Sequence, residues 1–186
     1  MVLTHGDRSV SRRLLGAVLA MALIAGLVVL GWTWRHPAAF RDAGGWGIDD
    51  TDNQVGDTLY VGMTYPRQDG GHVTLHGGQV NFRTGEDNAD ADLLLCTIDP
   101  DAPVGAIGGY RGDTIHEDCS ALVPLAGQRL ALQSAGMSHQ VVLKVTLTRP
   151  GSVEIADITL DYSHGWQRGS QRTGGQVTMT TGDAGS

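Results

Sequence analysis

Residues 140–162 read QVVLKVTLTRPGSVEIADITLDY, and this stretch decides the fold class. Its first half alternates apolar and mainly polar residues, with the period of a half-buried β-strand, and the apolar positions are Val141, Leu143, Val145 and Leu147. Pro150 and Gly151 interrupt the pattern and predict a turn. The apolar phase then resumes and slips by one residue at 156–157, where we expect a β-bulge. The stretch therefore predicts two antiparallel strands.

Similar short runs occur through residues 57–181. They cover 58–65, 73–82 with an interruption at Gly77 and Gly78, the continuous apolar run 93–98, and 176–181. Seven or so short strands, without a helical period among them, predict an all-β fold, an immunoglobulin-like antiparallel β-sandwich. The long-spaced cysteine pair and buried Trp of true immunoglobulin domains are absent, so the prediction concerns the class of fold. Residues 99–113, rich in Gly, Pro and Asp, are expected to form a surface excursion.

Residues 14–34, LLGAVLAMALIAGLVVLGWTW, carry no charged side chain. A helix of this length rises by about 30 Å, which is the thickness of a bilayer core. Arg8, Arg12 and Arg13 precede the run, and this basic flank predicts a cytoplasmic N-terminus. The sequence thus predicts a single-pass cell-membrane protein with an extracytoplasmic C-terminal domain.

A cleaved secretory signal is the alternative to this transmembrane helix, although its apolar core is usually shorter. With the uncleaved helix, the predicted organisation is a cytoplasmic N-terminus at 1–13, a transmembrane helix at 14–34 and a flexible linker at 35–56. An extracytoplasmic β-sandwich domain at 57–181 and a disordered tail at 182–186 complete the chain. The linker prediction rests on a composition rich in Gly, Asp and Ala without an apolar period.

Cys96 and Cys119 are the only cysteines, and both fall in the predicted exported domain. Oxidising compartments favour disulfides, and the spacing is not that of a catalytic Cys-x-x-Cys pair. We therefore expect one structural disulfide between them.

The formal net charge of −7 lies entirely within residues 57–186. Nucleic-acid binding requires clustered Lys and Arg, so this acidic domain is not expected to bind nucleic acid. No recognised hydrolase motif occurs, and neither an enzymatic activity nor a cofactor is predicted. An envelope hydrolase remains a third possibility.

His72 and His76 lie four residues apart and are the weak candidates for a metal site. Imidazole nitrogens together with the thioethers of the chain are ligands that suit copper. A copper-handling or other metal-handling extracytoplasmic domain is therefore the alternative function, whereas the main prediction includes no metal.

A polar segment at 162–173 contains the candidate contact residues Trp166, Arg168 and Arg172. In an extended strand they share one face, and Trp with Arg is the composition of a protein contact surface. An exposed hairpin protected by charge accounts for the same residues without a partner.

The segment 141–174, including the Pro150-Gly151 turn and the run Gly165-Trp166-Gln167-Arg168-Gly169, resembles small membrane-anchored proteins of unknown function from high-GC Gram-positive bacteria. The resemblance implies an envelope context and transfers no site residue. We therefore expect a non-enzymatic, membrane-tethered binding or accessory module of the cell envelope with a protein partner.

Overall fold

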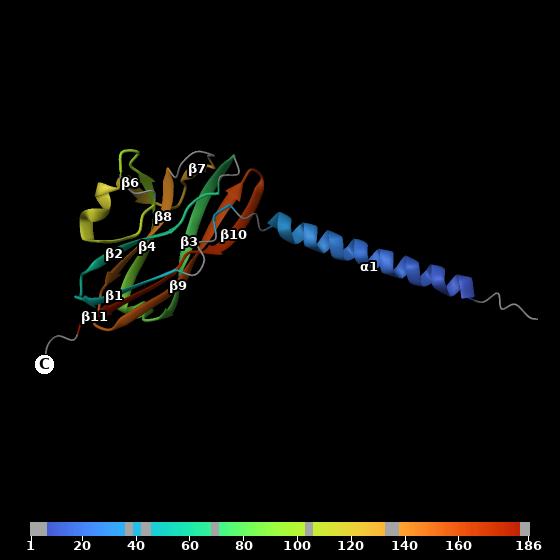
Figure 1. The fold of residues 1–186 in the computed structure, drawn as a ribbon, viewed down its shortest axis with the longest axis horizontal. Helices are drawn as coiled ribbons and strands as arrows, with labels where there is room; N and C mark the ends of the chain where they lie inside the picture. Colours follow the sequence, from blue (N-terminus) through green and yellow to red (C-terminus); the bar gives the residue numbers. More distant parts are fainter. Residues whose placement is uncertain are drawn as a thin grey trace, which may run out of the picture. The chain divides into compact units, whose positions relative to one another are not determined.

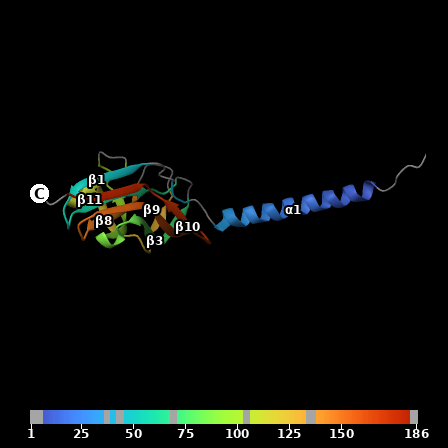
Figure 2. The same cartoon turned by 90° about the horizontal axis from the view of Figure 1, so that it is seen from below.

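The computed structural model describes residues 7–35, 39–41, 46–67, 71–102, 106–132 and 138–182. The chain divides into two units, Met1–His36 and Pro37–Ser186, which are treated separately below. Figure 1 and the second view in Figure 2 show a helical first unit and a β-sheet second unit. The predicted tail lies outside the described residues from position 183 onward.

The first unit contains one helix, α1 (Asp7–Arg35), which includes the whole apolar run 14–34. Its sequence explains the helix, because Leu, Ala and Met favour helical backbone and the apolar run contains no Pro. In the part of the chain that the structure describes, however, no helix combines the length and the apolar character of a membrane span. The predicted transmembrane helix is therefore confirmed as a helix only.

The second unit is a sandwich of two sheets. One sheet has the order β1-β11-β9-β3-β7, with β10 also paired to β9. Its strands are β1 (Gly47–Asn53), β3 (His72–Thr84), β7 (Arg129–Ala131), β9 (Ser152–His164), β10 (Gln167–Thr173) and β11 (Gln176–Thr181). The other sheet has the order β5-β2-β8-β4-β6. Its strands are β2 (Thr58–Thr64), β4 (Ala89–Ile98), β5 (Gly109–Arg111), β6 (Cys119–Pro124) and β8 (His139–Leu147).

The predicted β-sandwich is confirmed, and its immunoglobulin-like subtype stays a prediction. Neighbouring described strands pair antiparallel except β1 and β11, which run parallel. The alternating residues of β8 are buried between the sheets, as their period predicts. The predicted bulge is also present, because Asn81 pairs with Asp157 while Phe82 pairs with Ile155, which leaves Ala156 as the extra residue.

The predicted flexible linker at 35–56 needs correction. Residues 47–53 form β1, which pairs in parallel with β11 at the edge of its sheet. Sequence periodicity could not reveal this strand, because its run of Asp, Thr and Asn side chains is largely exposed and carries few apolar residues.

A short segment before β1 also docks on the domain. Phe40 is buried and forms an isolated bridge with Pro66. Its amide N–H donates to the Gln171 side chain, and Gln171 Nε2 donates back to the Phe40 carbonyl over 2.9 Å. This reciprocal pair, together with hydrogen bonds from Thr64 and Thr173 to the Arg41 carbonyl, fixes the segment against β2 and β10.

The excursion after β4 folds back over the outer face of the second sheet. Ile107 and Ile115 are buried there in a cluster that includes Val142 and Tyr60. Residues 112–117 form a short 3-10 helix, η2 (Gly112–Glu117), within this cover. The sheet is therefore buried on both faces around Cys96 and Val142, which explains the consecutive apolar residues at 93–96 in β4 and 141–143 in β8.

Gly62 permits this cover to approach β2. A Cβ atom at Gly62 would lie 2.2 Å from the Ile107 carbonyl oxygen, so only glycine fits. The Gln140 side chain accepts from the Ile107 amide over 2.7 Å and donates to its carbonyl over 3.2 Å. Gly62 thus leaves room for the excursion, and the Gln140 side chain holds it on the sheet through two hydrogen bonds to the Ile107 backbone.

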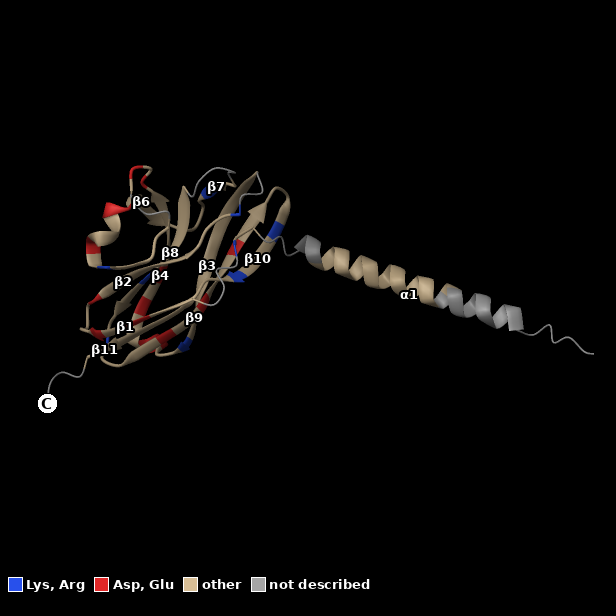
Figure 3. Cartoon of the chain, in the orientation of Figure 1, with Lys and Arg blue, Asp and Glu red and all other residues tan. Residues whose placement is uncertain are grey.

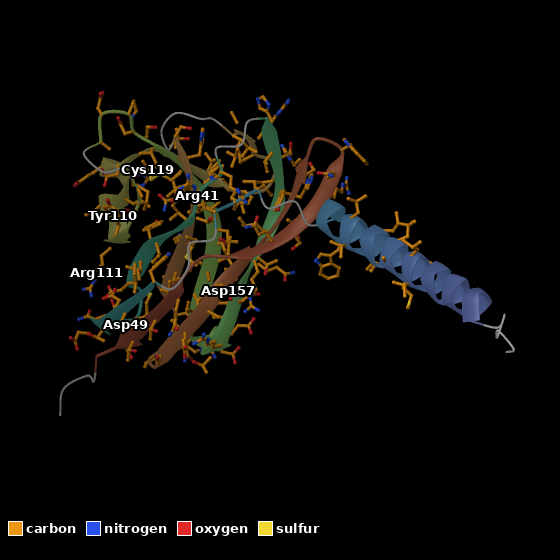
Figure 4. The ribbon with its side chains drawn as sticks, turned by 45° about the vertical axis from the view of Figure 1, so that its right-hand side comes forward. Arg41, Asp49, Tyr110, Arg111, Cys119 and Asp157 are labelled. Carbon is orange, nitrogen blue, oxygen red and sulfur yellow. A yellow bond between two sulfur atoms is a disulfide. The ribbon has the colours of Figure 1, made fainter. Side chains whose placement is uncertain are left out.

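The predicted disulfide is confirmed. Cys96 on β4 and Cys119 on β6 are bonded, with Cα atoms 5.5 Å apart, and both are buried beneath the excursion. Nearby, the Tyr110 hydroxyl donates to the Asp118 carboxylate. This hydrogen bond, followed by burial, raises the pKa of Tyr110 to about 12. Figure 4 shows Tyr110 and Cys119 at this side of the domain.

Candidate functional site

The outer edge of β3 is paired along only part of its length. Residues 72–74 pair with β7, and Leu75 exchanges backbone hydrogen bonds with the turn at 127–128. Beyond this point, no described residue pairs with 77–84 on the side away from β9. An edge of eight residues therefore presents backbone donors and acceptors without a protein partner in the described chain.

A groove of about 610 Å³ lies beside this edge, between β3 and β4. It is bordered by residues from both sheets, by the 3-10 helix η1 (Glu86–Asn88) and by the chain that leaves β6. The lining consists of Gly77, Gly78, Gln79, Val80, Phe82, Glu86, Ala91, Asp92, Leu93, Pro124, Leu125 and Ala126.

The floor of the groove is an exposed margin of the hydrophobic core. Val80 and Phe82 on β3, with Ala91 and Leu93 on β4, pack against the core but stay partly accessible. Their alternation points these side chains between the sheets, and no further described strand covers them at this edge. The floor is therefore apolar while the rim offers free backbone, which is the combination found in sites that bind extended peptides.

The charge at the rim is negative. Glu86 and Asp92 line the groove and are exposed. Arg83, the only basic residue of β3 between 77 and 84, is paired with Glu154 over 2.7 Å. Lys144 is the register neighbour of Asp92 on β8 but does not line the groove. The site therefore favours positively charged ligands over negatively charged ones.

The predicted contact residues lie on a different surface, the β9–β10 hairpin. Gly165 and Trp166 form its turn, with Gly165 at φ 62°, a conformation that glycine adopts without strain. Trp166 is 75% exposed at the tip and Arg168 is exposed beside it. The Arg172 guanidinium donates to Asp157 over 2.7 Å, and this hydrogen bond raises the pKa of Arg172. Figure 3 shows basic residues on β10.

The weak metal candidates are not brought together. His72 and His76 are both exposed on β3, and the register shift between Leu75 and Gly77 falls between them. His76 instead forms a hydrogen bond with Ser163 over 3.1 Å. Among the described residues, no group of three His, Cys, Asp or Glu side chains is arranged to hold a metal ion.

A second hollow, of about 310 Å³, lies near these histidines. Its lining comprises Gly71, His72, Thr74, Arg129, Ser163, His164 and Gly165. Arg129 places a permanent positive charge at this surface, which opposes binding of a metal cation. The hollow therefore gives no support to the metal-handling alternative.

Sequence reasoning missed the groove because it depends on which strands become neighbours. Val80 and Phe82 are recognisable as inward positions of a strand, but nothing local indicates that β7 covers only the first part of β3. The one sequence feature that could have indicated a free edge is the low charge of residues 77–84, where Arg83 is the single charged side chain.

No family model matches the chain, and no curated protein matches it.

Proposed function

We propose that this protein is a non-enzymatic, membrane-tethered module that binds another component of the cell envelope outside the cytoplasm. The observation that carries the binding role is the apolar groove beside the unpaired edge of β3. Ordinary sandwich edges are shortened, covered or charged, whereas this edge is eight residues long and has one basic side chain, already paired.

Two further features support the tether and the compartment. Large apolar side chains of α1 are 58–67% exposed within its unit, from Val18 to Trp32, and a lipid bilayer provides the apolar surroundings they require. The disulfide between Cys96 and Cys119 is the kind of bond that persists in oxidising compartments.

Site-specific photocrosslinking in cells tests the binding role. A photoreactive residue at Gln79, which lines the groove, should crosslink the full-length chain to a defined partner. The same residue at exposed Val55, outside the groove, should not. The same photoreactive residue at Trp166 tests whether the β9–β10 hairpin contacts a partner.

The Gln79 crosslink should weaken when Glu86→Gln and Asp92→Asn neutralise the rim and persist in Asp87→Asn with Asp90→Asn. The control pair is matched, because it neutralises an exposed carboxylate on η1 and another on β4 that do not line the groove. Crosslinking only from Trp166 would show that the binding surface is the β9–β10 hairpin and not the groove. Crosslinking from neither position would contradict the proposed function.

A further inference from the structure

We propose that the groove takes an extended polypeptide segment, which adds as a strand to the free edge of β3 and carries basic side chains between apolar ones. This inference rests on the proposed binding function and specifies its ligand class. The first argument is the backbone. Unpaired N–H and C=O groups along 77–84 are satisfied together by one ligand class, another extended peptide backbone.

The dimensions set the length of the segment. Eight residues of β-strand extend over about 26 Å, so a ligand segment of seven or eight residues matches the free edge. Successive side chains of an added strand point to opposite faces of the sheet. Every second ligand side chain therefore enters the groove of about 610 Å³ and lies over Val80, Phe82 and Leu93. These inward positions favour aliphatic residues.

The charges at the groove set the sign of the segment as a whole. Glu86 and Asp92 at the rim attract Lys or Arg, and the only basic side chain of the edge is held by Glu154. The net charge of −7 adds a longer-range preference for a cationic partner. An acidic extended segment would meet repulsion at both rim residues.

A second copy of this chain does not have these properties. The free edge of β3 contributes one basic residue, Arg83, and two acidic domains repel each other. The favoured occupant is therefore a different, basic polypeptide.

Peptide binding to the full-length chain tests this inference by fluorescence anisotropy. The probe is an eight-residue peptide of alternating Lys and Val. Its comparisons are an alternating Glu and Val peptide, and a peptide of the Lys and Val composition with the two residue types in separate blocks. We expect saturable binding of the first alone, weakened by added salt because exposed charges are screened. In Glu86→Gln with Asp92→Asn, its affinity should fall by about fivefold. In Asp87→Asn with Asp90→Asn, it should change little.

Backbone methylation tests strand addition directly. In a strand, alternate N–H groups point to opposite edges, so methylating the amide nitrogens of all Lys residues blocks one edge, and methylating those of all Val residues blocks the other. Strand addition predicts that only one of the two methylated peptides loses binding. Loss in both or in neither would overturn this mode of binding.

Other outcomes separate the inference from the function on which it rests. If the full-length chain sediments as a dimer that Val80→Pro, on the side of β3 that faces away from β9, dissociates, the occupant is a second copy and the inference fails. If no peptide binds while the Gln79 crosslink to a partner persists and responds to the rim variants, the module binds through its groove but not through an added basic strand. If neither peptide binding nor the Gln79 crosslink is observed, the proposed function fails as well.

Discussion

The Phe40 ring packs edge-to-face against the Tyr162 ring, with centroids 5.3 Å apart and planes inclined by 74°. Both side chains are 1% exposed. The Tyr162 hydroxyl also donates to Gln171 and accepts from the Ala39 amide. The short segment that precedes β1 is thus part of the folded domain.

Replacing Phe40 with alanine should therefore lower the free energy of unfolding by about 3–5 kcal/mol, because it leaves a cavity in the core. Denaturant unfolding of the full-length chain measures this loss. Val55→Ala is the control, because Val55 is 52% exposed, and its effect should stay within about 0.5 kcal/mol. A Phe40 variant as stable as this control would mean that the segment is not docked.

Removing the disulfide should loosen the excursion before the sandwich. In Cys96→Ala with Cys119→Ala, we expect the free energy of unfolding to fall by about 3 kcal/mol in the loop-entropy model. Hydrogen exchange should accelerate first at the amides of Ile107 and Ile115, while the amide of Leu143 in the core strand β8 should remain protected. Equal acceleration in β8 would show that the excursion and the sandwich unfold as one unit.

The hydrogen bond between Tyr110 and Asp118 predicts a pH dependence at the alkaline end. Because the folded pKa of Tyr110, about 12, exceeds its ordinary value of 10.0, the stability from this pair is complete below pH 10. It is lost as pH rises through the folded pKa. Tyrosinate absorbance should show late titrations for Tyr110 and for Tyr162, whose pKa is raised by burial, and the Tyr110 titration alone should move toward the ordinary value in Asp118→Asn. Asp113→Asn should leave that titration in place, and an unchanged curve in Asp118→Asn would contradict the assignment.

The β9–β10 hairpin should tolerate loss of its exposed side chains. Trp166→Ala with Arg168→Ala should change the free energy of unfolding by less than about 0.5 kcal/mol, because both residues are exposed. Thermal unfolding of the double variant measures this. If partner crosslinking from Trp166 occurs in cells, Arg168→Ala alone should reduce it without altering stability. If the double variant unfolds, Trp166 and Arg168 contribute to the stability of the folded domain and are not simply exposed.

Placing two charges in α1 should release the chain from membranes. Arginine in hydrocarbon costs about 2.5–3.5 kcal/mol per residue at the helix centre, so Leu23→Arg with Leu27→Arg should move the chain to the supernatant fraction. Protease added to cells with an opened outer wall should digest the second unit of the parent chain. Retention of the double variant in membranes, or digestion only after lysis, would contradict the proposed tether or its orientation.

Sequence reasoning succeeded where the signal was periodic and local. The alternation in β8, the phase slip near Asp157 and the turn at Gly151 all reappear in the structure. The disulfide followed from the number of cysteines and the expected compartment. In each case, a few neighbouring residues or a unique pair contained the information.

Features that depend on distant partners were not predictable. β1 is held by its ladder with β11 and by the Arg111 guanidinium, which binds Asp50 across the edges of the two sheets. Figure 4 places Arg111 near the strand that carries Asp49. The acidic composition of β1 resembles a linker until these partners are known. The groove was missed for the same reason, because a free edge is a property of the assembled sheet.

The parallel pairing of β1 and β11 has a mechanical consequence. Gly47 is aligned with Gln176 at one end of the ladder, and Asn53 with Thr181 at the other. Tension between the chain entering β1 and the chain leaving β11 acts along the strands from opposite ends. All the ladder hydrogen bonds then bear the load together and do not open one at a time. The domain is therefore built to resist tension applied between the start of β1 and the end of β11.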